Sequence, residues 1–154
     1  MYSKIKGFSN SFGSLVIVFF IFLTLPFKGV AEDGYRLWLR YDRITDENKL
    51  NEYRKNIQTI HFPGDSPVLK AAREELTNGI SGLLGVQVKF MDKLTGSGTL
   101  IVGTPKSSKV VASLKLNDKL KKLGREGYRI QNSLIKGKKC IVIAADTDVG
   151  ILYG

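Results

Sequence analysis

The side chains that most often carry out chemistry are scarce in this 154-residue chain, which holds one histidine, His61, and one cysteine, Cys140. A zinc site takes three or four His, Cys or carboxylate ligands, so these two residues do not make a conventional one. A Ser-His-Asp nucleophile would have to use the same histidine, and no Gly-x-Ser-x-Gly elbow is present. We interpret His61 as a residue at the end of a strand and Cys140 as a small buried hydrophobe.

Carboxylates offer another route to catalysis, because hydrolysis of a glycosidic bond requires two of them facing each other across a sugar. Glu74 and Glu75 are neighbours on an expected helix and point in different directions. Asp146 and Asp148 follow an apolar strand, where Asp148 is positioned to cap a helix that begins at the next residue. Glu126 stands at the entrance of a strand and is expected to accept backbone hydrogen bonds. The chain therefore predicts no catalytic, cofactor-binding or metal-binding residue.

The elements that position these residues follow from hydrophobic periodicity and from local start and stop signals. Ser66-Pro67 begins a helix, apolar residues then recur at helical spacing, and Gly85 ends it. A period of two or a short apolar run predicts strands over residues 35–41, 58–62, 86–90, 99–102, 128–131 and 139–145. Short helical segments are expected around 108–114 and 116–123, and Lys136-Gly137 forms a hairpin turn. The fold class is α+β, a two-layer sandwich of one mixed sheet with helices packed on it.

The first 31 residues have the pattern of a secretory signal peptide. Lys4 and Lys6 precede an apolar core over residues 15–25, and Gly29-Val30-Ala31 resembles a small-residue cleavage site. A transmembrane anchor is the alternative, although the core is short against the roughly twenty residues that span a bilayer. We expect export to the periplasm or the medium, with residues 32–154 as one domain that makes no membrane contact after cleavage. With one cysteine, this domain has no internal disulfide.

The formal charge of +10 is distributed over scattered lysines. Three of them, Lys4, Lys6 and Lys28, belong to the leader, and no acid does, which leaves +7 for residues 32–154. No basic strand carries the interleaved aromatic side chains on which bases stack. The charge is therefore interpreted as solvated surface, and nucleic acid is not expected as a partner.

Two segments at opposite ends of residues 33–154 together resemble a known module. Residues 33–41, Asp-Gly-Tyr-Arg-Leu-Trp-Leu-Arg-Tyr, stand at its start, and the motif Glu126-Gly127-Tyr128-Arg129-Ile130 leads to residues 144–154 at its end. Residues 71–76 and 100–105 agree in order and spacing. This combination is similar to the N-terminal domain of the α-glucuronidases of glycoside hydrolase family 67. The end motif alone also resembles the equivalent domain of the β-hexosaminidases.

The resemblance implies a small domain that precedes a catalytic (β/α)8 barrel. The family removes 4-O-methyl-glucuronic acid from glucuronoxylan-derived oligosaccharides with inversion, using barrel carboxylates and, on this interpretation, no cofactor. This chain stops where the family enters the barrel, so no family catalytic residue falls on it and the domain alone is expected to be inactive. A free-standing carbohydrate-binding or interaction module is the alternative, with Trp38, Arg36 and Arg40 on one strand face to stack a sugar and attract a uronate.

The last residues predict an apolar surface. A helix over residues 149–153 is too short to be stable in isolation, so Val149, Ile151, Leu152 and Tyr153 are expected to be partly exposed. Exposed apolar patches promote association, which predicts a marginally soluble or self-associating domain.

Overall fold

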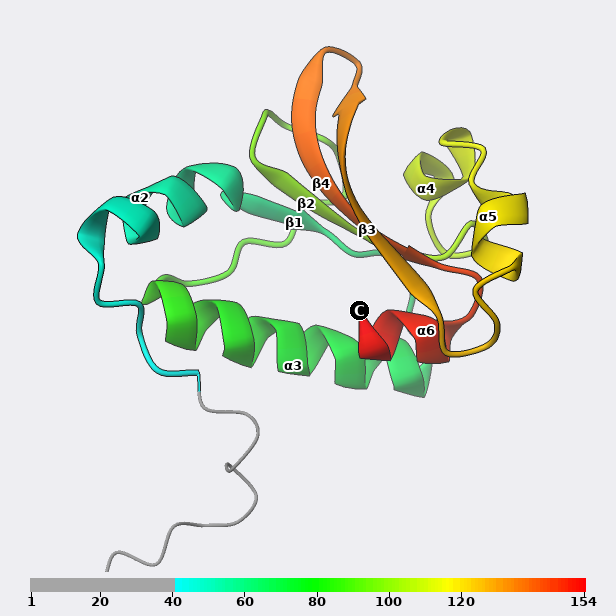
Figure 1. Cartoon of the computed structure of the whole chain (residues 1–154), viewed down its shortest axis with the longest axis horizontal. Coiled ribbons are helices and arrows are strands. Elements are labelled where there is room, and N and C mark those ends of the chain that lie inside the picture. Colours follow the sequence, from blue (N-terminus) through cyan, green and yellow to red (C-terminus); the bar gives the residue numbers. More distant parts are fainter. Residues whose placement is uncertain (1–40) are drawn as a thin grey trace, which may run out of the picture. The chain divides into compact units, whose positions relative to one another are not determined.

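The computed structural model describes residues 41–154. The expected signal peptide over residues 1–31 and the expected strand at 35–41, except Tyr41, lie outside the described residues. Within residues 41–154, strands β1 (Thr59–His61), β2 (Thr99–Gly103), β3 (Tyr128–Ile135) and β4 (Lys138–Ala145) form one sheet in the order β1-β2-β4-β3. The pairs β1–β2 and β2–β4 are parallel, and β3–β4 is antiparallel (Figure 1). The expected α+β fold with a mixed sheet is confirmed.

Helices cover both faces of this sheet. The long helix α3 (Pro67–Leu84) and the short helix α6 (Asp148–Tyr153) lie on one face, and α4 (Lys109–Ser113) and α5 (Asn117–Lys121) lie toward the other (Figure 1). Helix α2 (Glu47–Asn56) packs at the C-terminal end of α3 through Leu50. The helix and sheet layers of the expected sandwich are therefore present, with α4 and α5 added on the opposite face.

The ends of α3 are as the sequence predicts. The Ser66 hydroxyl accepts a hydrogen bond from the Leu69 N–H at 3.2 Å, and Pro67 occupies the first helical position. Gly85 follows the last turn with φ of 59°, the left-handed conformation that glycine adopts without a steric penalty. Arg54 of α2 also caps the C-terminal end of α3, because its Nε and Nη2 both donate to the Leu84 carbonyl, at 2.9 and 2.6 Å.

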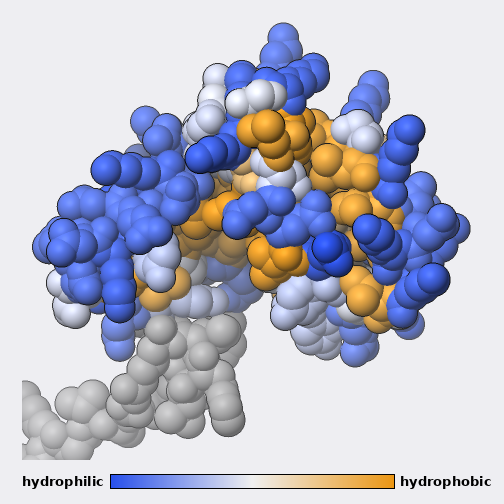
Figure 2. Space-filling view, turned by 45° about the horizontal axis from the view of Figure 1, so that its top comes forward, coloured by the Kyte–Doolittle hydropathy of each residue, from blue (hydrophilic) through white to orange (hydrophobic). Residues whose placement is uncertain are grey.

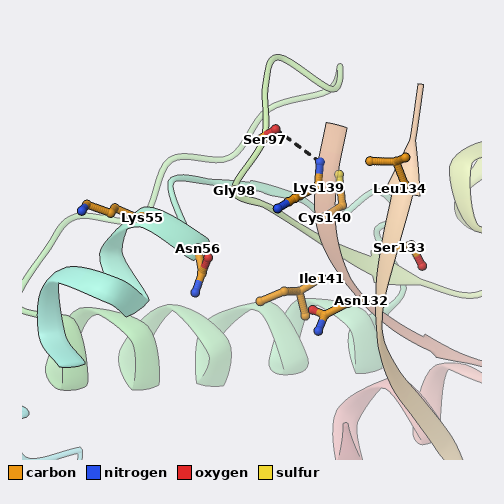
Figure 3. Close-up of a pocket in the computed structure, with 10 residues that line it drawn as sticks. All are labelled: Lys55, Asn56, Ser97, Gly98, Asn132, Ser133, Leu134, Lys139, Cys140 and Ile141. Carbon is orange, nitrogen blue, oxygen red and sulfur yellow. Dashed lines mark hydrogen bonds between the residues drawn. The ribbon is translucent and has the colours of Figure 1, made fainter. Parts of the chain in front are cut away.

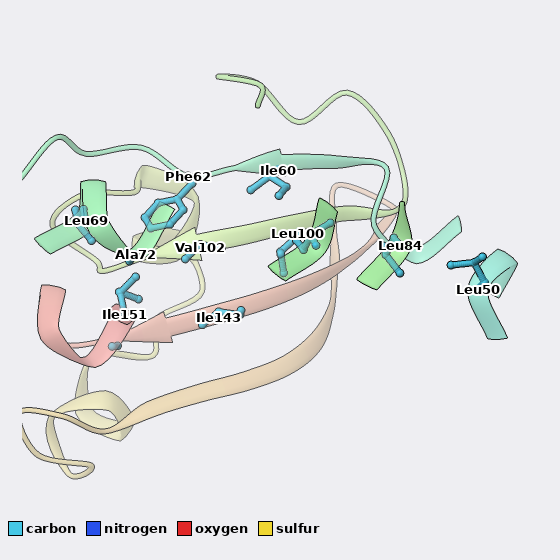
Figure 4. Close-up of a cluster of buried hydrophobic side chains, with 12 residues drawn as sticks. Leu50, Ile60, Phe62, Leu69, Ala72, Leu84, Leu100, Val102, Ile143 and Ile151 are labelled. Carbon is cyan, nitrogen blue, oxygen red and sulfur yellow. The ribbon is translucent and has the colours of Figure 1, made fainter. Parts of the chain in front are cut away.

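The core has two parts, one on each face of the sheet. The part under α3 and α6 is drawn in Figure 4 and comprises Leu50, Ile60, Phe62, Leu69, Ala72, Ile80, Leu84, Leu100, Val102, Ile143, Ala145 and Ile151. The part under α4 and α5 comprises Ile101, Val111, Leu116, Leu120, Ile135, Cys140, Val142 and Ala144. Alternate residues of β2 and β4 enter the two parts, since successive side chains of a strand point to opposite faces. This explains why β4 is apolar on both faces, as expected of a central strand.

The hairpin between β3 and β4 confirms the Lys136-Gly137 turn. The two residues have φ of 51° and 75°, so both central positions of the turn are left-handed. Such turns match the right-handed twist of the two strands that they join. The register that follows pairs Ile130 with Ile143 and Asn132 with Ile141.

Three expectations are corrected by the structure. Residues 86–90 are not a ladder strand but make one isolated parallel bridge, between Phe90 and Ile60, because β1 is only three residues long. Thr147, rather than Asp148, caps α6 by accepting from the Gly150 N–H at 3.1 Å. The side chain of Ile151, expected to be partly exposed, is buried in the core at 3 % exposure.

Candidate functional site

His61 is a packing residue at the end of β1, as the sequence predicts. Its side chain is 7 % exposed, and its Nδ1 lies 3.2 Å from the Met91 carbonyl. Because a carbonyl only accepts, Nδ1 carries the proton, and Nε2 is left to accept from the buried Ser108 hydroxyl at 3.5 Å. Ser108 in turn caps α4. The ring therefore ties β1 to two neighbouring segments.

Cys140 lies in the first half of β4 with 3 % of its surface exposed. Burial raises the pKa of its thiol above the usual value, which keeps the group protonated. A neutral thiol is a poor nucleophile and a poor metal ligand, so the interpretation of Cys140 as a buried hydrophobe is confirmed.

The carboxylates considered in the sequence analysis have different environments in the fold. The Glu75 carboxylate accepts from the Tyr41 hydroxyl at 3.3 Å, and burial, followed by this negative charge, raises the pKa of Tyr41. The Asp148 carboxylate accepts from the Ser66 hydroxyl at 2.7 Å, which joins the first turns of α6 and α3. Glu74 and Glu126 are exposed to solvent. Glu75 and Asp148 are thus each bound to the hydroxyl group of a residue in another segment.

A cavity of about 620 Å³ lies between the end of α2 and the β3–β4 hairpin (Figure 3). Its lining combines amide, hydroxyl, ammonium and apolar groups, from Lys55, Asn56, Ser97, Gly98, Asn132, Ser133, Leu134, Lys139, Cys140 and Ile141. The Lys139 N–H donates to the Ser97 hydroxyl at 3.2 Å, as the dashed line in Figure 3 shows. Its lining contains no carboxylate, so it does not hold the pair of carboxyl groups that glycosidic hydrolysis uses.

Two further hollows also lack paired acids. A cavity of about 250 Å³ beside α3 and α6 is lined mainly by apolar side chains, and Glu75 is the one carboxylate in its lining. A groove of about 510 Å³ near α4 has several lysines and Asp92 in its lining. Within residues 41–154, no group of three His, Cys, Asp or Glu side chains is placed to hold a metal ion. In the same part of the chain, no helix has the length and apolar character needed to cross a bilayer.

Arg73 is a half-buried residue whose contacts the sequence did not predict. Its Nη2 donates to the Phe62 and Gly64 carbonyls at 2.6 and 2.8 Å, and its guanidinium lies 5.2 Å and 5.6 Å from the ring centres of Phe62 and Phe90. This geometry allows cation–π attraction to both rings. The signal in the sequence was an arginine directly after Ala72, on the apolar side of the helix. Its role is to hold the loop after β1 against α3.

These observations define an α+β domain whose mixed sheet has a packed core on each face. Residues 37–154 match the family model described as glycosyl hydrolase family 67 N-terminus. The chain belongs to this family, as the N-terminal domain of the α-glucuronidases. A search of curated proteins gives no match to the chain. The resemblance to family 67 is thereby confirmed.

Proposed function

We propose that this chain is the N-terminal accessory domain of an α-glucuronidase that acts in xylan degradation. The enzyme would release 4-O-methyl-glucuronic acid from xylo-oligosaccharides, and this domain would pack on the catalytic barrel as a scaffold. The observation that carries the proposal is the family match over residues 37–154, where the family domain is the N-terminal part of a multidomain enzyme.

The distribution of carboxylates supports the scaffold role. An inverting glycosidase holds a general acid and a general base about 6.5–9.5 Å apart on opposite sides of the sugar. Here Glu75 is bound to Tyr41, Asp148 to Ser66, and the Asp46 carboxylate caps α2. Each of these carboxylates stabilises a helix or joins two segments. Catalysis is therefore assigned to the barrel.

An activity assay tests this assignment. The purified chain is incubated with aldouronic acids, and free 4-O-methyl-glucuronic acid is measured beside an intact family 67 α-glucuronidase as the positive control. We expect release by the control and none by the chain. Release by the chain that is lost on Glu75→Gln, and kept on the exposed control Glu74→Gln, would contradict the proposal.

We further propose that the protein is exported and that its mature form begins at Glu32. The basic start, the apolar core and Ala31 at the end of a small-residue site support this processing. N-terminal sequencing of the protein from its host tests it. An intact Met1 in a membrane fraction would favour the anchor instead.

A further inference from the structure

The cavity of about 620 Å³ is bounded by three segments that are tied together at Gly98. The Gly98 N–H donates to the Lys139 carbonyl at 2.9 Å, and the Gly98 carbonyl accepts from the Gln58 N–H at 2.7 Å. The Lys139 N–H also donates to the Ser97 hydroxyl. These hydrogen bonds hold β4 and the segment after α2 against the loop before β2. A cavity whose walls are fixed in this way loses little conformational freedom when a ligand binds.

One face of the β3–β4 hairpin contributes four side chains to the cavity. Asn132 lies opposite Ile141, and Leu134 lies opposite Lys139. Because the two pairs are two positions apart, all four side chains are on the same face of the sheet. An amide, an ammonium and two aliphatic groups are therefore side by side. On the face of the molecule shown in Figure 2, hydrophobic side chains likewise reach the surface between hydrophilic ones.

Three polar side chains of the lining are open to a ligand. Lys139, Asn56 and Asn132 are exposed to solvent, and the hydrogen bonds of Lys139 to the loop use only its backbone atoms. In Figure 3, the Lys139 side chain extends from β4 toward the end of α2, where Asn56 lies, whereas the Lys55 side chain points away from the cavity. One ammonium group and two amides therefore face the same space.

These groups match a sugar that carries one carboxylate. An ammonium group in a lining without a carboxylate attracts a single negative charge. Amides both donate and accept, so Asn56 and Asn132 each have the groups to bind hydroxyls of a sugar ring. Ile141 and Leu134 offer aliphatic surface to the C–H face of the ring. The cavity volume lies within the range of roughly 300–1,000 Å³ that is usual for sites of small molecules.

Other anionic ligands fit the lining less well. It holds no aromatic side chain on which a base could stack, which disfavours a nucleotide. Phosphate and sulfate sites combine several cationic or backbone N–H donors, whereas one ammonium group faces this cavity (Figure 3).

We propose that this cavity binds one uronate sugar, with the carboxylate on the Lys139 ammonium group and ring hydroxyls on the amides of Asn56 and Asn132. The domain then holds a sugar of its own in addition to packing on the barrel. This inference rests on the proposed function only in the choice of glucuronate as the probe.

A titration of the full chain, followed by the NMR signals of its backbone amides, tests the site with glucuronate, glucose and acetate. Glucose has the same ring with a hydroxymethyl group in place of the carboxylate, and acetate has the carboxylate without the ring. We expect glucuronate to give saturable shifts in residues 55–56, 97–98, 132–134 and 139–141. Its dissociation constant should be at least about tenfold lower than that of glucose or acetate.

Three variants test the assigned roles. Lys139→Gln should weaken glucuronate binding at least about fivefold and leave glucose binding unchanged, because a neutral amide replaces the ammonium group. Asn132→Ala should weaken the binding of both sugars. Lys119→Gln on α5 is the matched control and should leave both unchanged. All three side chains are exposed, so their substitution leaves the fold intact, and unchanged NMR signals outside the cavity verify this.

Three results would overturn the proposal. The first is the lack of saturation by glucuronate in the millimolar range. The second is equal binding of glucose or of acetate, which would make the cavity a general sugar or anion site. The third is an equal effect of Lys119→Gln, which would assign the binding to the overall surface charge. None of these measurements uses activity, so their failure would remove the sugar site and leave the scaffold role intact.

Discussion

A hydrogen bond joins the N-terminal ends of α3 and α6, and its removal has a predictable cost. The Ser66 hydroxyl donates to the Asp148 carboxylate at 2.7 Å and accepts from the Leu69 N–H at 3.2 Å. Loss of the helix cap in Ser66→Ala costs about 1 kcal/mol. Loss of a hydrogen bond to a charged group costs about 1.5–3 kcal/mol when buried, and we take about 1 kcal/mol because both side chains are half-buried. The free energy of unfolding should therefore fall by about 2 kcal/mol.

Urea unfolding followed by circular dichroism measures this change, and a double-mutant cycle separates its two parts. Ser66→Ala, Asp148→Ala and the double variant should give a coupling energy of about 1 kcal/mol. Ser113→Ala is the matched control, since Ser113 is exposed and its hydroxyl bonds only the Val110 carbonyl of its own helix; its effect should stay within about 0.5 kcal/mol. A coupling energy near zero, with Ser66→Ala no worse than the control, would refute the reasoning.

Two further substitutions probe other parts of the domain. Gly98→Ala should lower the free energy of unfolding by about 2 kcal/mol or more, because Gly98 has φ of 76° and an added Cβ would lie 2.5 Å from the Lys55 carbonyl oxygen. Gly96→Ala, where an added Cβ meets nothing within 4 Å, is the control in the same urea-unfolding assay. Burial and the Glu75 carboxylate raise the pKa of the Tyr41 hydroxyl above its ordinary value of 10.0 in the folded state. The Tyr41 hydroxyl therefore loses its proton at a higher pH in the folded state than in the unfolded state. As a result, the free energy of unfolding falls as the pH rises above 10.0. Between about pH 8 and about pH 11, urea unfolding should show a smaller loss of the free energy of unfolding for Tyr41→Phe than for the unmodified chain. An equal loss in the two proteins would show that ionisation of Tyr41 does not cause it.

The elements that the sequence predicted well are those with local causes. Both ends of α3 follow from Ser66-Pro67 and Gly85, since a capping hydroxyl, a proline and a left-handed glycine act within a few residues. The β3–β4 hairpin follows from Lys136-Gly137 for the same reason. Residues 86–90 show the limit of this reasoning. Val86 and Val88 do pack against the core as their alternation indicates, but whether they join a ladder depends on the length of β1.

The same distinction between local causes and long-range packing applies to the residues of the candidate site. The scarcity of histidine and cysteine and the separation of the acids along the chain led to the expectation that no residue here is catalytic, and this stays a prediction. The link between Ser66 and Asp148 spans 82 positions, so no local pattern reveals it. The packing of α6 beside α3 is equally non-local, because the two helices meet only in the folded domain. The burial of Ile151 follows from the same packing, since one side of α6 faces the core and the other remains exposed.

The most direct test of the central claim is a chimera in which this chain replaces the N-terminal domain of a family 67 α-glucuronidase, joined to its barrel after Gly154. The measured quantity is release of 4-O-methyl-glucuronic acid from aldouronic acids, by the chimera, by the barrel alone and by this chain alone. We expect an active chimera, a barrel that alone is less active or less stable, and no release by this chain. Release by this chain alone, or a chimera no better than the bare barrel, would contradict it.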